Sequence, residues 1–342
     1  MKALREISNQ VFEFDESVLP EYLRHRYVPN PKTMFKGVRK LPPGSVVRWD
    51  IEGGLNISRY FEPMELGIRK STSFKNGSLV EEFNNLLERS VSLRMMSDVP
   101  FGAFLSGGLD SSTIVAKMSK ISNVAIRTFS VGFEEGEDSE LEYSRKIADH
   151  FGCDHNELII RAEDLPDYLN ELIELRDAPV SEPSDIPIFL LSKFASTKVK
   201  MVLTGEGADE VLLGYDIFFE NRIRQFWRKN KRSKIRPLLF KKLYNYLPQF
   251  NNDRYFDISK DFYKKFLINH KSIYFSHLVR WSQYDQISKY FNFSRDQKMI
   301  IKDYISSTDV KLEKLSKDRR AQFFEFDTLL ANYLLSSQGD RM

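Results

Sequence analysis

Two short stretches combine glycine, hydroxyl and carboxylate residues in a pattern suited to phosphate chemistry. The first, SGGLDSS, covers residues 106–112 and follows the apolar run VPFGAFL that begins at Val99. Gly107 and Gly108 lack a Cβ, so the backbone there can take positive φ and approach a bulky anion closely. The serine hydroxyls and the start of a following helix add hydrogen-bond donors. This combination predicts a phosphate cradle.

Asp110 lies inside this cradle, where a carboxylate would repel bare phosphates unless a divalent cation lies between them. The motif therefore points to a magnesium nucleotide. The ordinary alternative is a strand-to-helix turn with an Asp or Ser N-cap. Seven consecutive positions suited to phosphate, at the end of a strand, favour the cradle over the simple turn.

The second stretch, VKMVLTGEGADEVLLGY, runs over residues 199–215 and gathers Glu206, Asp209 and Glu210 after a strand. Acidic residues in a first helical turn often only complement the helix dipole. If the two stretches lie at the same sheet edge, however, Asp209 can share a magnesium ion with Asp110.

The elements that must position these residues alternate between helix and strand from residue 79 onward. Apolar spacing predicts helices over 79–96, 111–118, 139–152 and 190–196, and strands over 99–105, 124–133, 155–161 and 199–205. Strands separated by single helices imply a parallel sheet with helices on both faces, so the fold class is α/β. Loops at the carboxyl ends of such strands form the ligand crevice.

The first sixty residues have a different character. GSVVRWDI and LNISRYF alternate apolar and polar residues around Gly53-Gly54, which predicts short antiparallel strands. We therefore expect a β-rich segment over 1–62, a linker over 63–78 that is rich in Pro, Gly, Ser and Thr, and a second domain over 79–342.

Several other motifs are absent. No Gly-Lys-Ser/Thr follows the glycines at 107 and 108, so the loop is not a Walker A loop. GEGADE has Glu210 where a dinucleotide fingerprint needs its third glycine, and there is no Gly-x-Ser-x-Gly elbow. A serine hydrolase would also need a histidine as general base, and the chain has only five histidines, so this class of enzyme has little support.

Composition sets further bounds. The 342 residues carry 51 basic and 48 acidic side chains, a formal net charge of +3, so the whole chain makes no electrostatic case for nucleic acid or membrane. Cys153 is the single cysteine, and no signal peptide or 20-residue apolar run is visible. These features predict a soluble, cytoplasmic protein with no internal disulfide.

Together these motifs resemble the synthetase domain of glutamine-dependent asparagine synthetases. SGGLDSS is similar to that family's pyrophosphate-binding loop, and TGEGADEVLLGY to its second ATP-binding motif. TFSVGF, EDSELEYSRKIADHFG and DAPVSEPSDIPIFLLS match as well, and YVPNPKTMFKGVRKLPPGSVVRWD resembles the end of the glutaminase domain. The resemblance spans nearly the whole chain and implies an α/β fold of the ATP-pyrophosphatase, adenine nucleotide alpha hydrolase-like type.

The resemblance implies a ligase that activates aspartate with ATP to a β-aspartyl-AMP and pyrophosphate, after which ammonia displaces AMP to give asparagine. Glu206 would be the catalytic residue near the reacting centre, and Asp110 and Asp209 would bind Mg2+. The implied ATP-binding residues are Leu105, Ser106, Gly107, Gly108, Asp110, Ser111, Ser112, Val131, Thr204 and Gly205.

The chain also departs from this pattern. No cysteine lies near Met1 to hydrolyse glutamine, and the sequence stops at Met342 within a family motif, so we expect a chain truncated at both ends. Thr204 replaces a usual serine, and Leu213 a usual glycine. A relative that adenylates another carboxylate and an inactive nucleotide-binding fragment remain alternatives. A separate glutaminase domain and a homodimer are left open as partners.

One further stretch stands apart. Residues 222–242, RIRQFWRKNKRSKIRPLLFKK, carry ten Lys or Arg and no acidic residue. Basic patches with aromatic residues can bind nucleic acid. In the absence of a nucleic-acid motif, a solvated cationic helix face is the favoured interpretation.

Overall fold

The computed structural model describes residues 2–8, 11–62, 76–134, 140–176, 179, 182–287, 290–291 and 312–340. The chain divides into two compact units. Residues 69–208 and 334–342 form one, here called the sheet unit, and residues 1–68 and 209–333 form the other, called the helical unit.

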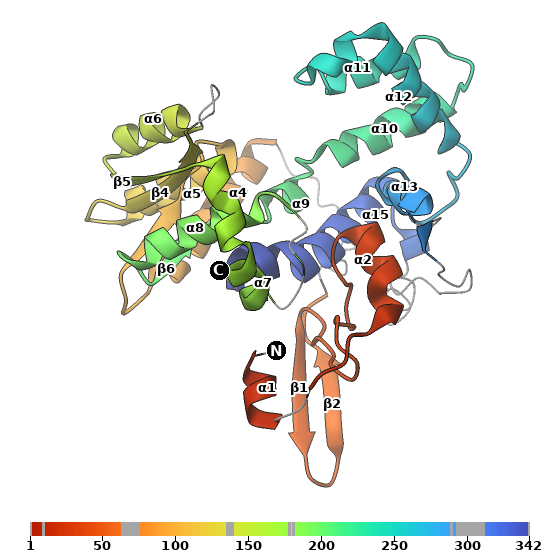
Figure 1. The fold of residues 1–342 in the computed structure, drawn as a ribbon. Helices are drawn as coiled ribbons and strands as arrows, with labels where there is room; N and C mark the ends of the chain where they lie inside the picture. The colour runs from red at the N-terminus through yellow and green to blue at the C-terminus, as the bar shows by residue number, and fades with distance from the viewer. Residues whose placement is uncertain are drawn as a thin grey trace. The chain divides into compact units, whose positions relative to one another are not determined.

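The sheet unit alternates helices and strands, as the apolar spacing predicts (Figure 1). Its elements are α4 (Asn76–Met95), β3 (Phe101–Phe104), α5 (Leu109–Ile121), β4 (Arg127–Phe133), α6 (Leu141–Phe151), β5 (Asp154–Ile160), η2 (Ala162–Tyr168), α7 (Leu169–Arg176), α8 (Asp185–Ser196), β6 (Met201–Leu203) and η8 (Ser336–Asp340). Every strand and helix predicted between residues 79 and 205 is present, with shifted ends.

The four strands form one parallel sheet in the order β5-β4-β3-β6. After β3 the chain moves outward through β4 to β5, and it then returns to the other side of β3 to form β6. The strand order therefore reverses between β3 and β6, and the crevice beyond such a reversal is where open α/β sheets bind ligands. One glycine-rich loop follows β3, and the other follows β6.

Apolar clusters cover both faces of the sheet. On one face α4, α5 and α6 pack through Val91, Val115, Met118 and Ala148 against Ala103 of β3. On the other face α8 packs through Leu191 and Ala195 against Phe129 of β4. The predicted α/β class, a parallel sheet with helices on both faces, is confirmed.

The helical unit contains most of the remaining elements. They are α1 (Lys2–Ser8), η1 (Glu16–Val18), α2 (Leu19–His25), β1 (Ser45–Asp50), β2 (Gly54–Arg59), α10 (Asp216–Arg228), η3 (Arg236–Leu238), α11 (Leu239–Leu243), η4 (Pro248–Asn251), α12 (Asp253–Lys265), α13 (Leu278–Ile287), η6 (Leu312–Lys314) and α15 (Lys317–Phe323). The short helix α9 (Ala208–Leu212) and the π-helical segment η7 (Phe324–Leu334) cross the boundary between the units.

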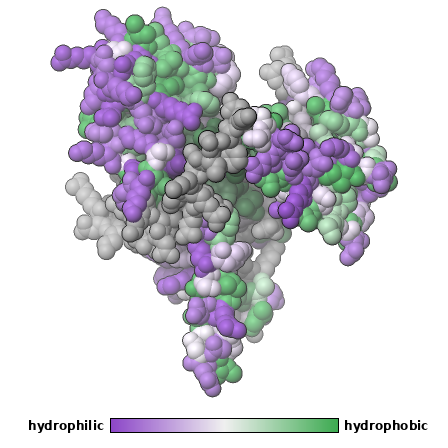
Figure 2. Space-filling model, turned by 180° about the vertical axis from the view of Figure 1, so that it is seen from behind, coloured by the Kyte–Doolittle hydropathy of each residue, from purple (hydrophilic) through white to green (hydrophobic). Residues whose placement is uncertain are grey.

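The predicted antiparallel strands are confirmed as the hairpin β1-β2, in which Ser45 pairs with Arg59 and Asp50 with Gly54. The hairpin carries exposed apolar side chains, among them Trp49 and Leu55, which are 68% and 64% exposed. Hydrophobic patches are visible along the hairpin at the bottom of Figure 2. A hairpin with so much exposed apolar surface has the character of a binding surface.

The N-terminal segment is joined to elements far along the chain within the helical unit. The Asn30 backbone N–H donates to the Asn332 Oδ1 at 2.7 Å, and the Tyr27 and Tyr333 rings stack with centroids 5.7 Å apart. Such contacts, across some three hundred positions, group residues 1–68 with 209–333.

The predicted end of the β-rich segment at residue 62 and the predicted start of the second domain at residue 79 stay predictions. Residues 63–75 of the predicted linker lie outside the described residues, and 76–78 belong to α4. No helix in the described part of the chain combines the length and apolar character needed to cross a membrane.

Candidate ATP site at the switch point of the sheet

The loop that follows β3 is closed by its own hydroxyl groups. The Ser106 Oγ lies 3.0 Å from the Ser111 Oγ and accepts a hydrogen bond from the Gly108 N–H at 3.2 Å. The Ser111 Oγ accepts from the Ser106 N–H at 3.2 Å and donates to the Gly108 carbonyl at 3.3 Å. These bonds hold the turn in one conformation, which lowers the ordering cost of binding an anion there.

Two glycines allow tight packing around this turn. Gly107 has a φ of +79°, and a Cβ there would lie 2.6 Å from the Tyr143 Cβ and 2.7 Å from the Ser144 backbone nitrogen. A Cβ on Gly205, just after β6, would lie 2.8 Å from the Ser111 backbone nitrogen and 2.9 Å from the Asp110 Cβ. Only glycine fits at either position. The loop after β6 therefore packs directly on the start of α5, which brings the two glycine-rich stretches together.

The N-terminus of α5 offers uncapped donors at this point. Gly108 is the extended N-cap residue and supplies no side-chain hydrogen bond to the first turn. Asp110 lies in that first turn, because the helix begins two residues earlier than the sequence predicts. The Ser112 Oγ is buried and, within the described residues, has no hydrogen-bond partner. Orphan helix amides beside an unpaired hydroxyl suit a phosphate ligand.

Leu105 and Val131, predicted to flank the adenine, lie in different apolar clusters. Leu105 is 1% exposed and packs with α5, whereas Val131 packs toward α8. The structure does not bring these two side chains together. The Leu105 N–H donates to the Phe129 carbonyl at 2.9 Å, and the Ser130 hydroxyl donates to the Leu105 carbonyl. The backbone N–H and carbonyl of Leu105 thus already have partners in β4, and the place of Leu105 and Val131 in a nucleotide site stays a prediction.

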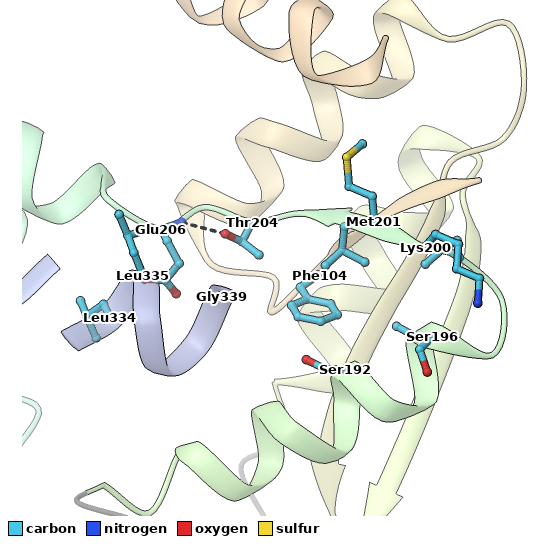
Figure 3. A pocket seen from close by; sticks show the side chains of 13 residues that line it. Phe104, Ser192, Ser196, Lys200, Met201, Thr204, Glu206, Leu334, Leu335 and Gly339 are labelled. Atoms are coloured by element: carbon cyan, nitrogen blue, oxygen red, sulfur yellow. Dashed lines mark hydrogen bonds between the residues drawn. The ribbon is translucent and has the colours of Figure 1, made fainter. Parts of the chain in front are cut away.

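Thr204 and Glu206 line a pocket of about 510 Å³ beside the free edge of β6. The Glu206 N–H donates to the Thr204 Oγ1 at 3.4 Å. In Figure 3 Lys200 lies toward one end of this pocket and Glu206 at the other, close to Leu335. One cationic and one anionic side chain thus face the same space. Sequence reasoning missed the pocket because its lining comes from β3, α8, β6 and the C-terminal segment, with no motif of its own.

Asp209 belongs to the helical unit, so its predicted partnership with Asp110 on one metal ion stays a prediction. Its carboxylate lies over Gly214, where a Cβ would be 1.9 Å from the Asp209 Oδ1. Glu210 is fully buried and accepts a hydrogen bond from the Tyr215 hydroxyl at 2.8 Å. The three acidic residues of GEGADE therefore have separate environments, and the carboxylate of Glu210 has a structural role.

Leu213, which the sequence analysis singled out in place of a glycine, has a φ of +65°. This left-handed conformation costs a residue with a Cβ about 1–2 kcal/mol. The side chain packs with Ile217 and Phe218, which offsets part of that cost. The left-handed backbone explains why a glycine is expected at this position, and the leucine side chain adds apolar contacts that a glycine would lack.

Strongly perturbed histidines lie in the helical unit. Burial lowers the pKa of His277, although its hydrogen bond to Glu325 at 2.8 Å opposes the change. Burial by itself raises the pKa of Glu325, but the nearby Arg280 and His277 stabilise the carboxylate and leave that pKa lowered. Burial likewise lowers the pKa of His25, against the opposing effect of Glu21. The pairs of Glu325 with His277 and Arg280 join η7 to the start of α13, whereas the His25–Glu21 pair lies within α2, whose His25 ring contacts Trp281 of α13.

No group of three or more His, Cys, Asp or Glu side chains in the described residues is arranged to hold a metal ion. Mg2+ is usually bound through one or two carboxylates together with substrate phosphates and water. Asp110, packed beside Gly205 at the start of α5, is a carboxylate of this kind, and its role as a metal ligand stays a prediction.

Comparisons with known proteins agree with this geometry. The family model described as Asparagine synthase matches residues 82–342. Asparagine synthetase [glutamine-hydrolyzing] 1 of Bacillus subtilis is 34% identical over 219 residues, which are 64% of this chain and 34% of that protein. A putative asparagine synthetase of Mycobacterium tuberculosis is 36% identical over 209 residues, 61% of this chain and 32% of that protein. The chain thus spans about a third of the length of these relatives.

Solved structures give weaker matches. An NH3-dependent NAD synthetase from Campylobacter jejuni gives a TM-score of 0.28 at 17% identity, covering 42% of this chain and 61% of that one. A U34-tRNA thiolase from Methanococcus maripaludis gives 0.32 at 14% identity, covering 79% and 97%. Scores this low support no conclusion about this chain. The sequence match over most of the chain, together with the glycine-rich loops at the switch point, shows that it belongs to the asparagine synthase family.

Proposed function

We propose that this chain carries the ATP-dependent half of asparagine synthesis. The observation that supports it best is the contact between the two glycine-rich loops, where Gly205 leaves room for Asp110 and the Ser111 amide. Family membership supports an enzyme that uses ATP, and the uncapped start of α5 supports a phosphate site.

In the proposed reaction a carboxylate oxygen of aspartate attacks the α-phosphorus of ATP. The bond from that phosphorus to the bridging oxygen breaks, which releases pyrophosphate and leaves β-aspartyl-AMP. Ammonia then attacks the acyl carbon, AMP leaves, and asparagine forms after loss of a proton. Residues 106–112 and the α5 amides would bind the pyrophosphate portion and stabilise the charge that develops on it.

Asp110 and Asp209 would hold Mg2+, which supplies positive charge to the phosphate oxygens. The pocket beside Glu206 would receive the acceptor, with Glu206 near the reacting carboxylate and Lys200 as a counter-charge. Ammonia would come from glutamine through a separate glutaminase domain; the names of the relatives describe those proteins as glutamine-hydrolyzing.

The first test is to identify the nucleotide product from Mg-ATP, aspartate and ammonium, with circular dichroism confirming that the protein is folded. Formation of AMP that requires aspartate supports the proposal. Formation of AMP only with another carboxylate identifies a relative of different specificity. A folded protein that binds Mg-ATP and forms no AMP with any carboxylate would be a nucleotide-binding fragment.

The metal assignment is tested by Asp110→Ala and Asp209→Ala. Each substitution removes a carboxylate that would bind Mg2+, so each should weaken Mg-ATP binding while changing the affinity for metal-free ATP much less. Isothermal titration in the presence and absence of Mg2+ measures both affinities. Asp98→Ala, an exposed carboxylate before β3, is the matched control. Unchanged Mg-ATP affinity in both variants would remove these residues from the metal site.

A further inference from the structure

The basic stretch 222–242 forms part of a concave site within the helical unit. A cavity of about 620 Å³ lies between the end of α10, the loop that follows it, η3, α11 and one face of α12. The α12 residues in its lining fall at positions 253, 256, 257, 260 and 264, the three- and four-residue spacing of a single helix face. Hydrophilic side chains dominate this segment at the upper left of Figure 2.

Positive charge is in excess in this cleft. Six basic side chains line it against two acidic ones, which leaves an excess of four positive charges. The acidic residues are already paired, since Lys241 contacts Asp253 at 2.8 Å and Lys260 contacts Asp257. The other four basic side chains, which belong to Lys231, Arg232, Lys234 and Lys264, make no ion pair with any residue that the structure describes.

The cleft also contains a buried donor that lacks an acceptor. Trp227 lines the cleft and is 2% exposed, and its indole Nε1 has no hydrogen-bond partner among the described residues. The indole N–H can only donate. A buried donor without an acceptor is costly, and an anionic ligand oxygen that comes within hydrogen-bond distance of this N–H would satisfy it. This observation is independent of the lysines and points to the same class of ligand.

Trp227 and Phe256, the aromatic residues in the lining of the cleft, are buried and do not offer a surface for stacking bases. Phe256 is 6% exposed, and the Lys241 and Lys260 amines lie 4.7 and 5.9 Å from its ring centroid. The Arg236 guanidinium covers the nearby Phe226 ring at 4.2 Å. Binding of single-stranded nucleic acid usually relies on free aromatic faces. A pocket of this volume suits a compact ligand of about nucleotide size.

We propose that this cleft binds a compact polyanion carrying two or more phosphate groups, held by the four unpaired basic side chains and the Trp227 indole. The site is distinct from the nucleotide site of the sheet unit, and the proposal does not depend on the proposed function. A solvated cationic helix face, which the sequence favours, accounts for the charges but leaves the indole donor unexplained.

The experiment is a calorimetric titration of the full chain with inorganic tripolyphosphate in Mg2+-free buffer. We expect saturable binding in this cleft that weakens as salt is added. Tripolyphosphate bound at the proposed phosphate cradle of the sheet unit would be a second site, which Gly205→Ala weakens and the lysine substitutions leave intact. Lys234→Gln combined with Lys264→Gln should weaken binding about tenfold or more, because each substitution removes a charge-assisted contact. The matched control, Lys229→Gln with Lys242→Gln, removes the same charge from exposed positions outside the cleft and should leave the affinity unchanged.

Trp227→Phe keeps the aromatic ring and removes only the N–H, so it should also weaken binding, and thermal unfolding will show whether the variant remains folded. Mg-ATP binding should persist in the lysine variants, and tripolyphosphate binding in the cleft should persist in Gly205→Ala, which places the two sites apart. Absence of saturable binding, or equal weakening by the control pair, would overturn the proposal. Tighter binding of an oligonucleotide than of tripolyphosphate, with the same lysine dependence, would replace the proposed ligand by nucleic acid.

Discussion

Gly205→Ala is the most direct test of the nucleotide site. The residue has no positive φ, so alanine introduces no backbone strain and only the space matters. The new Cβ would lie 2.8 Å from the Ser111 nitrogen and 3.0 Å from the Asp110 carbonyl carbon. Real Cβ atoms essentially never approach backbone this closely, so the loop after β6 must move away from the start of α5.

This movement would cost the site one or two hydrogen bonds to a charged ligand, each worth about 1.5–3 kcal/mol. Mg-ATP should therefore bind about 10- to 20,000-fold more weakly, at about 1.4 kcal/mol for each factor of ten. Overpacking should lower the free energy of unfolding by about 1–3 kcal/mol, small enough for the protein to remain folded.

Titration with a non-hydrolysable Mg-ATP analogue measures the affinity, and urea unfolding measures the stability. Gly77→Ala is the matched control, because a Cβ on this exposed glycine of α4 meets nothing within 4 Å. A folded Gly205→Ala protein that binds the analogue as well as the control does would refute the argument that the two loops form one site.

Two further predictions concern stability. Burial lowers the pKa of both His25 and His277 in the folded state, so the unfolded chain binds more protons below the ordinary histidine pKa. Their contribution to the free energy of unfolding is therefore complete well above the ordinary histidine pKa of about 6.5, and it falls at lower pH by about 1.4 kcal/mol for each unit by which folding lowers the pKa. The urea midpoint should begin to drop near about pH 7.5 and continue to drop to about pH 5.5. The drop should be less steep in His277→Gln, and equal slopes would contradict this. Arg176 and Asp185 form an ion pair at 4% and 0% exposure, so Arg176→Met should cost about 3–5 kcal/mol by removing the cation from beside a buried carboxylate. Adding Asp185→Leu should restore part of the loss, and a single variant of wild-type stability would contradict the assignment.

Much of the sheet unit is determined by local sequence. The apolar spacing from residue 79 onward predicts every strand of the sheet and its helices α4, α5, α6 and α8, but not η2 or α7, because burial on a sheet or helix face imposes a period that a single stretch already shows. The hairpin β1-β2 is visible in the same way. The ends of these elements are less well determined by local sequence. Helix α5 begins at Leu109 because Gly108 takes an extended N-cap conformation, and this places Asp110 in the first helical turn.

The chemistry of the loops is also readable from residue types, since glycines, hydroxyls and a helix start are each suited to phosphate by their own structure. Tertiary structure alone determines that Gly205 packs against Asp110 and Ser111, because strand order, and not sequence distance, brings β6 beside β3. It likewise separates Glu210, which is buried against Tyr215, from the exposed Glu206 four residues earlier.

The basic stretch shows the same division most clearly. Its ten Lys and Arg residues are plain in the sequence and are compatible there with a solvated helix face. Only the folding of α12 against α10 and α11 makes a cleft from them and buries the Trp227 indole with no acceptor. Composition and period are properties of a segment, so the sequence by itself determined most of the elements and predicts the phosphate chemistry. Concavity and unpaired buried donors are properties of segments brought together, so only the tertiary structure could decide them.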